Sequence, residues 1–338
     1  MTAYEQTLAH LTASPKKWLV TGAAGFIGSH LVEALVAASQ TVVALDNFTT
    51  GKRQTLKLFS SSAGGRFTIL EGDIRSLATC REACRDVDFV LHQAAQVSVP
   101  ASMEDPTTTH DINLTGFLNM LLAAREAKVQ RVVYASSCAV YGDSPHLPLK
   151  EDEPPRPLSP YAASKLANEI YADSFARSHG VQAIGLRYFN VFGPRQDPKG
   201  VYAAVIPSWA TSMIRGTPIE IFGDGSTTRD FCYIANVVQA NLLAATAELK
   251  DASHTVVNVA AGARTSLNEL FALLRKMLLP DHPHLAAFQP DYRDFRPGDI
   301  RHSHADIAKA RQFLGYSPSH TVEEGLREAL AWYRSSTA

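Results

Sequence analysis

One stretch near the start of the chain decides the fold: Lys17-Trp18-Leu19-Val20-Thr21-Gly22-Ala23-Ala24-Gly25-Phe26-Ile27-Gly28-Ser29-His30-Leu31. A short apolar run ends in a glycine turn, and the pattern of an amphipathic helix follows. Gly22 permits a tight turn, Gly25 lets the backbone approach a pyrophosphate, and Gly28 lets the helix pack closely on the strand. The start of the helix offers free N–H groups and partial positive charge to phosphates. The stretch therefore predicts the first strand, turn and helix of a dinucleotide-binding sheet.

The second predicted strand indicates which dinucleotide is bound. Residues 41–45 are apolar and β-branched, and the run ends at Asp46. An acid at this place holds the ribose 2′-hydroxyl of NAD and repels the 2′-phosphate of NADP. Lys52 and Arg53 could serve a 2′-phosphate instead, but Asp46 lies closer to the expected position, so we predict NAD. Asp73, just after the third strand, either accepts the adenine amino group or caps a turn.

Composition excludes several classes of function. The chain has 338 residues and a net charge of −1, so it has no basic field for nucleic acid or anionic lipid. Its four cysteines form no C-x-x-C pair, and neither a disulfide framework nor a metal site is indicated. No apolar run reaches the length of a membrane span, and the first residues show no signal-peptide core. We expect a cytoplasmic protein.

The rest of the N-terminal half alternates strands with helices. Strands are predicted over residues 67–70, 88–92 and 131–135, and helices over 77–84 and 111–128. Such alternation is typical of a doubly wound parallel sheet, in which ligands bind beyond the carboxyl ends of the strands.

The candidate catalytic residues follow the fifth predicted strand. Ser137 stands at the end of this strand, and Pro160 marks the start of a helix that carries Tyr161 and Lys165 one turn apart. The phenol of a tyrosine has an ordinary pKa of about 10, and a nearby ammonium, together with the positive nicotinamide, favours the phenolate and lowers that pKa. The hydroxyl of Ser137 could hold the substrate oxygen and relay its proton. The three residues predict proton transfer to and from a hydroxyl group.

Motifs along nearly the full chain carry a family resemblance. They are T-G-A-A-G-F-I-G-S-H, L-D-N-F, G-D-I, H-Q-A-A, S-S-x-x-V-Y-G, S-P-Y-x-x-S-K, L-R-Y-F-N-V-F-G-P-R-Q, G-D-G-x-x-x-R-D-F and R-P-G-D. The chain resembles the extended short-chain dehydrogenases/reductases, and within them the UDP-hexose 4-epimerases. The N-terminal extension and three further segments resemble the UDP-N-acetylglucosamine 4-epimerases of O-antigen pathways: R-Q-D-P-x-G-x-Y-A-A-V-I-P, R-D-F-C-Y-I and Y-R-D-F-R-x-G-D-x-R-H-S.

This resemblance implies a fold and an activity. The fold is a Rossmann-type doubly wound parallel sheet with a smaller, mixed C-terminal substrate domain. We expect an NAD-binding domain at 1–187, to which 230–260 return, and a UDP-sugar-binding domain at 188–229 and 261–338. The activity is reversible 4-epimerisation of UDP-N-acetylglucosamine through a 4-keto sugar, with UDP-glucose and UDP-galactose as further substrates. Homodimers are common in the family.

The resemblance also implies roles for matching residues. Ser137 and Tyr161 form the catalytic pair, and Lys165 binds the nicotinamide ribose. The expected cofactor contacts also include Gly22, Gly25, Phe26, Ile27, Gly28, Asp46, Asn47, Gly51, Asp73, Ile74, Gln93, Ala94, Ala95, Asn113, Ser136, Tyr188 and Val191. The expected substrate contacts are Val97, Ser137, Asn190, Gln196, Ala204, Val205, Arg229, Arg296, Asp299 and Ser303. Among these, the two arginines would hold the diphosphate and the aspartate the uridine ribose.

The substrate is predicted from a few positions. Ser303 stands where a bulky tyrosine would restrict the pocket to plain hexoses, so an N-acetylated sugar should fit. Val97, Cys138 and Ala139 depart from the N-acetyl-specialised relatives and change the polarity of the pocket.

Four alternatives remain. A 4,6-dehydratase or decarboxylase of the same fold is disfavoured, because dehydratases need an acid pair where Cys138-Ala139 stand. A UDP-glucuronate 4-epimerase shares the motifs but needs a polar or cationic pocket for the carboxylate. A lipid-linked sugar epimerase would need an anchor that the sequence does not show. A non-catalytic sensor of NAD or sugar nucleotide is disfavoured, because Ser137, Tyr161 and Lys165 are all present.

Overall fold

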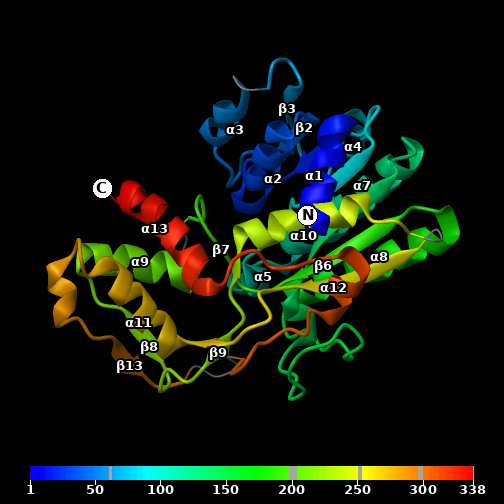
Figure 1. The fold of residues 1–338 in the computed structure, drawn as a ribbon. Helices are drawn as coiled ribbons and strands as arrows, with labels where there is room; N and C mark the ends of the chain where they lie inside the picture. Colours follow the sequence, from blue (N-terminus) through cyan, green and yellow to red (C-terminus); the bar gives the residue numbers. More distant parts are fainter. Residues whose placement is uncertain (61–62, 198–203, 250–252, 296–299, 338) are drawn as a thin grey trace.

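Seven strands form one parallel sheet in the order β11-β6-β5-β4-β1-β2-β3. Figure 1 shows the whole fold as a ribbon coloured along the sequence. The computed structural model describes residues 1–60, 63–197, 204–249, 253–295 and 300–337. The strands are β1 (Lys17–Thr21), β2 (Thr41–Asp46), β3 (Phe67–Glu71), β4 (Phe89–His92), β5 (Arg131–Ser137), β6 (Ala183–Tyr188) and β11 (His254–Val259). This is the doubly wound sheet expected from the sequence, and the strand order reverses between β1 and β4.

Helices cover both faces of the sheet, because successive strand residues point to opposite sides. In β1, Trp18 and Val20 join one apolar core while Leu19 joins the other. The first core is closed by α1 (Ala3–Ala13), α2 (Phe26–Ala37) and α10 (Ile234–Thr246). The second is closed by α4 (Leu77–Ala83), α7 (Gly116–Glu126) and α8 (Pro160–His179). Both cores leave the carboxyl ends of the strands open for a ligand.

One predicted helix begins earlier than expected. The sequence pattern placed its start at Asp111, whereas α6 (Pro106–His110) leads through a π-helical turn (Asp111–Thr115) into α7. Asp105 accounts for the earlier start, because its side chain accepts a hydrogen bond from Thr108 N and a proline follows at the first helical position.

The C-terminal part forms smaller layers beside the sheet. Its two-stranded ladders pair β10 (Cys232–Tyr233) with β7 (Val191–Phe192), β12 (Thr265–Ser266) with β9 (Thr228–Arg229), and β13 (Asp291–Arg293) with β8 (Glu220–Phe222). Its other helices are α9 (Val205–Arg215), α11 (Leu267–Leu278), α12 (Ala308–Leu314) and α13 (Val322–Thr337), while α3 (Arg53–Ser60) and α5 (Val99–Glu104) belong to the sheet domain. In the described ranges no helix is long and apolar enough to cross a membrane.

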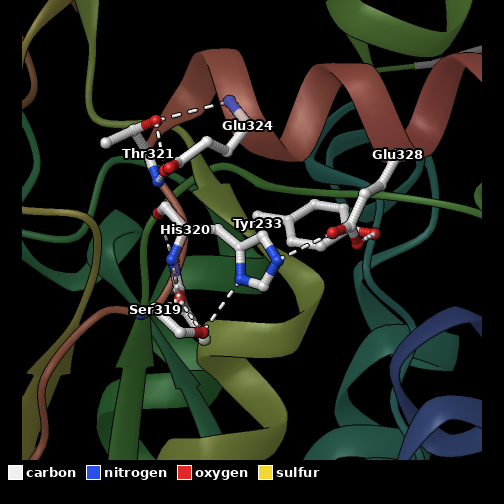
Figure 2. A network of polar contacts seen from close by, with 7 residues as sticks. Tyr233, Ser319, His320, Thr321, Glu324 and Glu328 are labelled. Atoms are coloured by element: carbon white, nitrogen blue, oxygen red, sulfur yellow. Dashed lines mark hydrogen bonds and ion pairs between the residues drawn. The ribbon is translucent and has the colours of Figure 1, made fainter.

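Polar contacts attach the last helix to this part (Figure 2). The hydroxyl of Tyr233 donates to Glu328 Oε2 at 2.9 Å, and His320 Nε2 lies 3.0 Å from Glu328 Oε1. Thr321 and Glu324 cap the start of α13, because the threonine hydroxyl accepts from Glu324 N and the carboxylate accepts from Thr321 N. These contacts fix α13 against β10, close in the chain to Arg229.

Candidate active site

The glycine turn after β1 is built for close approach. Gly22 has a φ of +63°, which favours glycine, and a Cβ there would lie 2.8 Å from Ala94 N. A Cβ on Gly28 would overlap Gly22 O and lie 2.9 Å from Ala23 Cα. Gly25 is the N-cap of α2 and brings no side chain to the helix start. The turn thus leaves bare backbone in front of the first N–H groups of α2, as a pyrophosphate requires.

Asp46 has a role in shaping this turn that the sequence did not reveal. Its Oδ2 accepts from Ala24 N and its Oδ1 from Phe48 N, both at 2.8 Å. A Cβ on Gly51 would lie 2.6 Å from the Ala24 side chain and 3.1 Å from Asp46 Oδ1. The Asp46 carboxylate therefore joins the glycine turn to the loop after β2. Gly51 leaves free the space beside this carboxylate that a side chain would occupy. These residues fit a dinucleotide with a free ribose 2′-hydroxyl.

Asp73 caps a turn, as one of its two interpretations expects, and its contact with adenine stays a prediction. Its carboxylate accepts from the backbone N–H and the guanidinium of Arg75, with the closest ion-pair contact at 2.8 Å, and from Asn47 Nδ2 at 3.0 Å. The hydrogen bonds from Arg75 lower the pKa of Asp73 to about 2. The side chain of Ile74 is buried against Gly116 in the second core. Asp73 and Ile74 thus stabilise the loop after β3, at the carboxyl end of the strand where the cofactor is predicted to bind.

The loop after β4 lies beside the glycine turn, where the strand order reverses. Thr21 Oγ1 accepts from Gln93 N at 3.2 Å and from Ala94 N at 3.1 Å. The Tyr188 hydroxyl donates to Gln93 Oε1 at 3.1 Å, and Asn241 Nδ2 donates to that hydroxyl at 2.8 Å. Asn241, a fully buried amide on α10, was missed from the sequence; an asparagine in an apolar helix is the signal that could have found it.

Other residues predicted to contact the cofactor lie near the same carboxyl ends of the strands. Asn113, in the π-helical turn, accepts from Gln96 N and donates to Gln96 O and Ser164 Oγ. Both the oxygen and the nitrogen of the Asn113 amide thus hold the loop after β4. Four more lie partly buried near the strand ends: Phe26, Ile27, Ala95 and Val191.

The three candidate catalytic residues come together at the end of β5. Lys165 Nζ donates to Ala135 O at 2.8 Å and lies 5.9 Å from the centre of the Tyr161 ring. The Ser137 hydroxyl lies close enough to the Tyr161 phenol to lower its pKa, and Ser137 Oγ accepts from Ala139 N at 3.2 Å. Ser159 caps α8 and Pro160 is its first residue, so the sequence itself starts the helix that carries both side chains.

Burial dominates the electrostatics of this group. It raises the pKa of Tyr161 to about 12, against the lowering effect of the Ser137 hydroxyl. Burial also lowers the pKa of Lys165 to about 8. In the protein by itself the loss of solvent outweighs the neighbouring groups, and a lowering of the tyrosine pKa by the ammonium together with the positive nicotinamide stays a prediction for the protein with bound NAD.

A cavity of about 120 Å³ opens directly beyond Ser137. It is lined by Cys138, Ala139, Gly142, Ser144, Leu149, Asn190, Arg229, Ile300, His302 and Ser303. Three predicted substrate residues therefore share one cavity: Asn190, Arg229 and Ser303. Ser144, Leu149 and His302 were not predicted as substrate residues. His302 lies in the quoted R-H-S segment beside Ser303, whereas no quoted motif contains Ser144 or Leu149, which the packing of distant loops brings here.

Four of the other predicted substrate residues are not among those that line this cavity: Val97, Gln196, Ala204 and Val205. Val97 is 68% exposed, and Ala204 is exposed just before Val205 begins α9. Gln196 donates to Val191 O, and its Oε1 is buried with no partner among the described residues. Arg296 and Asp299 lie outside the described residues.

Known proteins similar to this chain are sugar-nucleotide epimerases. The model of the NAD dependent epimerase/dehydratase family matches residues 18–260. A UDP-glucose 4-epimerase from Mycolicibacterium smegmatis is 36% identical over 94% of this chain and 99% of its own length. A UDP-glucuronate 4-epimerase from Thermodesulfobacterium geofontis is 32% identical over 94% of this chain and 96% of its own.

A solved structure shows the same architecture. UDP-N-acetylglucosamine 4-epimerase from Methanobrevibacter ruminantium, in complex with UDP-N-acetylmuramic acid, has 38% identity and a TM-score of 0.87. The match covers 95% of this chain and 99% of that one. Together with the glycine turn, Asp46 and the group around Tyr161, these matches show that the chain belongs to the NAD dependent epimerase/dehydratase family, within the extended short-chain dehydrogenases/reductases.

Proposed function

We propose that the protein interconverts UDP-N-acetylglucosamine and UDP-N-acetylgalactosamine, with UDP-glucose and UDP-galactose as further substrates. The observation that carries the proposal is the cavity beside Ser137. Half of its ten lining residues have small side chains or none, among them Ala139 and the buried Ser303. A wall of this kind leaves room for a 2-acetamido group and also accepts a plain hexose.

In the proposed reaction the chain moves a proton at the sugar 4-hydroxyl. Tyr161 accepts this proton as phenolate, and Ser137 holds the same oxygen through its hydroxyl. The Lys165 ammonium, one helical turn away, favours the phenolate. Bound NAD supplies the acceptor and donor of the C4 hydride, with no net oxidation or reduction. The residues of the glycine turn, with Asp46, would hold it.

UDP must stay anchored while the sugar turns to present its other face. Arg229 lines the cavity, and its NH1 donates to Thr228 O at 3.0 Å, which orients the guanidinium. A guanidinium pairs well with phosphate oxygens. We therefore propose Arg229 as a diphosphate ligand at the entrance of the sugar cavity.

The second candidate substrate is UDP-glucuronate, which a relative's name suggests. Its carboxylate would need a cation in the sugar cavity besides Arg229, which we assign to the diphosphate. The hydroxyl of Ser144, which lines the cavity, donates to Glu153 Oε1 at 2.7 Å and accepts from His146 N at 3.2 Å, so its proton is already used within the protein. The carboxylate of Glu153, behind Ser144, disfavours a second carboxylate, that of the sugar, in the cavity. This contact supports a neutral sugar.

The test is direct conversion by the purified protein. Without added cofactor, it is incubated separately with UDP-N-acetylglucosamine, UDP-glucose and UDP-glucuronate, and the epimers are separated. We expect turnover of the first two. We expect Ser303→Tyr to lower activity with the acetylated sugar at least about tenfold and to keep activity with UDP-glucose. The added ring would fill the space of the acetamido group, and overpacking of this kind costs about 1–3 kcal/mol. Ser303→Ala is the matched control. Turnover of UDP-glucuronate alone would overturn the proposal.

A further inference from the structure

A buried ion pair stands directly behind the catalytic residues. Glu169 on α8 is 6% exposed and Arg187 on β6 is 4% exposed. Arg187 Nε donates to Glu169 Oε1 at 2.9 Å, and its NH2 donates to Oε2 at 2.7 Å. Ser136, also buried, donates to Glu169 Oε1 at 2.5 Å. Burial of two charges costs free energy of folding even when they are paired. Apolar side chains would fill this space at a lower cost, so packing alone does not explain the pair.

The spacing along α8 connects Glu169 with the reaction. Tyr161, Lys165 and Glu169 are four residues apart, so they lie on one face of the helix. Each faces a different one of the last three residues of β5: Lys165 donates to Ala135 O, Glu169 accepts from Ser136 Oγ, and the Tyr161 phenol lies near the Ser137 hydroxyl. Two hydrogen bonds thus join helix and strand, and the one made by Glu169 lies directly before Ser137 in the strand.

Arg187 extends the same assembly around the cavity. Its NH1 donates to Glu151 O at 3.3 Å, in the loop that leads to Leu149 on the cavity wall. Its guanidinium also lies 4.7 Å from the centre of the Tyr141 ring, in the short segment that follows Ser137. One cation therefore holds the helix of Tyr161, the segment after Ser137 and a wall of the sugar cavity.

We infer that Glu169 is a positioning residue, which together with Arg187 and Ser136 fixes the Ser137 hydroxyl against the Tyr161 phenol. It touches neither substrate nor cofactor in this arrangement and acts through the end of β5. Proton transfer at the sugar hydroxyl needs this spacing held closely, since small misplacements of reacting groups lower rates steeply. The inference deepens the proposed function and rests on it for the activity measurements.

The test compares kcat and KM of variants that contain bound NAD. We expect Glu169→Gln to lower kcat about 10- to 100-fold, with KM changed less than about threefold, because geometry and not binding is lost. Glu169→Gln leaves Arg187 unpaired and can prevent folding, so Ser136→Ala is a second variant that keeps the ion pair. We expect it to lower kcat about 3- to 10-fold. The control is Arg177→Gln, which removes an exposed ion pair with Asp173 from the same helix and should leave kcat within about twofold.

A double-mutant cycle separates positioning from general destabilisation. In a Ser137→Ala background the hydroxyl to be positioned is gone, so Ser136→Ala should lower kcat by less than about 1.5-fold. Equal losses of kcat in both backgrounds, or a change confined to KM and melting temperature, would overturn the inference.

A measurement without substrate keeps this inference separate from the proposed function. Amide hydrogen exchange over residues 131–142 of the NAD-bound protein should rise in Ser136→Ala and remain unchanged in Arg177→Gln. If the wild-type protein turns over no UDP-sugar, the proposed function fails, and exchange still decides whether the end of β5 is held by Ser136 and Glu169. Unchanged exchange in Ser136→Ala would contradict it.

Discussion

The buried ammonium of Lys165 should lower the free energy of unfolding, although in the proposed reaction it favours the Tyr161 phenolate. Lys165 is 3% exposed, and its Nζ makes one hydrogen bond, to Ala135 O at 2.8 Å. Lys165→Met keeps the length of the side chain and removes the charge. We expect this variant, freed of NAD, to gain stability relative to the wild type at neutral pH.

The magnitude follows from the pKa. Burial lowers the pKa of Lys165 from 10.5 to about 8. At about 1.4 kcal/mol for each pH unit, the buried ammonium costs about 3 kcal/mol at pH 7, where it is charged in both folded and unfolded protein. As pH rises from 8 toward 10.5 the folded protein loses this proton first, so the wild type gains stability and the penalty falls to about 1 kcal/mol at pH 10. The lost bond to Ala135 O costs the variant about 1–3 kcal/mol at every pH.

Urea unfolding of both proteins at pH 7 and pH 10 tests this reasoning. The difference in unfolding free energy, variant minus wild type, should fall by about 2 kcal/mol between these pH values. Lys276→Met is the control, because this side chain is 73% exposed and its substitution should give no pH-dependent difference. A difference for Lys165→Met that stays constant from pH 7 to pH 10 would refute the claim that burial controls this ammonium.

Three further outcomes test the site. Tyr161→Phe should lower epimerase activity about 10²- to 10⁴-fold in a coupled assay while the NAD content stays that of the wild type; activity within tenfold would remove Tyr161 from the proton transfer. Gly28→Ala sets a methyl group against Gly22 O, so thermal unfolding should show a loss of about 1–3 kcal/mol and the purified protein should carry less NAD. Asp46→Asn puts an amide donor opposite a backbone N–H, either of Ala24 or of Phe48, and urea unfolding should show a loss of about 1–3 kcal/mol; an unchanged midpoint would contradict the turn-shaping role.

Local patterns in the sequence predicted the frame of the site well. The apolar run before Gly22 and the β-branched run before Asp46 are strands in the structure, paired side by side in the expected parallel sheet. Ser159 and Pro160 start α8 where a capping residue and a proline predict it, which sets Tyr161 and Lys165 on one face. These features depend on neighbours within a few residues, so the sequence carries them directly.

The sequence predicted less where distant segments meet. Asp73 was predicted as an adenine ligand or a turn cap; its cap on Arg75 is local, whereas its hydrogen bond from Asn47 depends on the neighbouring strand. The start of the helix at Pro106 was missed, because the apolar pattern that follows Asp111 is stronger than the short polar turn before it. The walls formed by Ser144 and His302 come from loops far apart in the chain.

By itself the sequence determined the strand–turn–helix order and predicted the dinucleotide site and the residues that we propose to move a proton. Helix caps, glycine turns and strand patterns are decided over a few residues, and the resulting sheet must bring its ligands to the carboxyl ends of its strands. Tertiary structure alone decided the energetics of that chemistry. Burial raises the pKa of Tyr161 and lowers that of Lys165, and the Glu169–Arg187 pair joins helix to strand, because desolvation and ion pairing depend on the segments that close around a side chain.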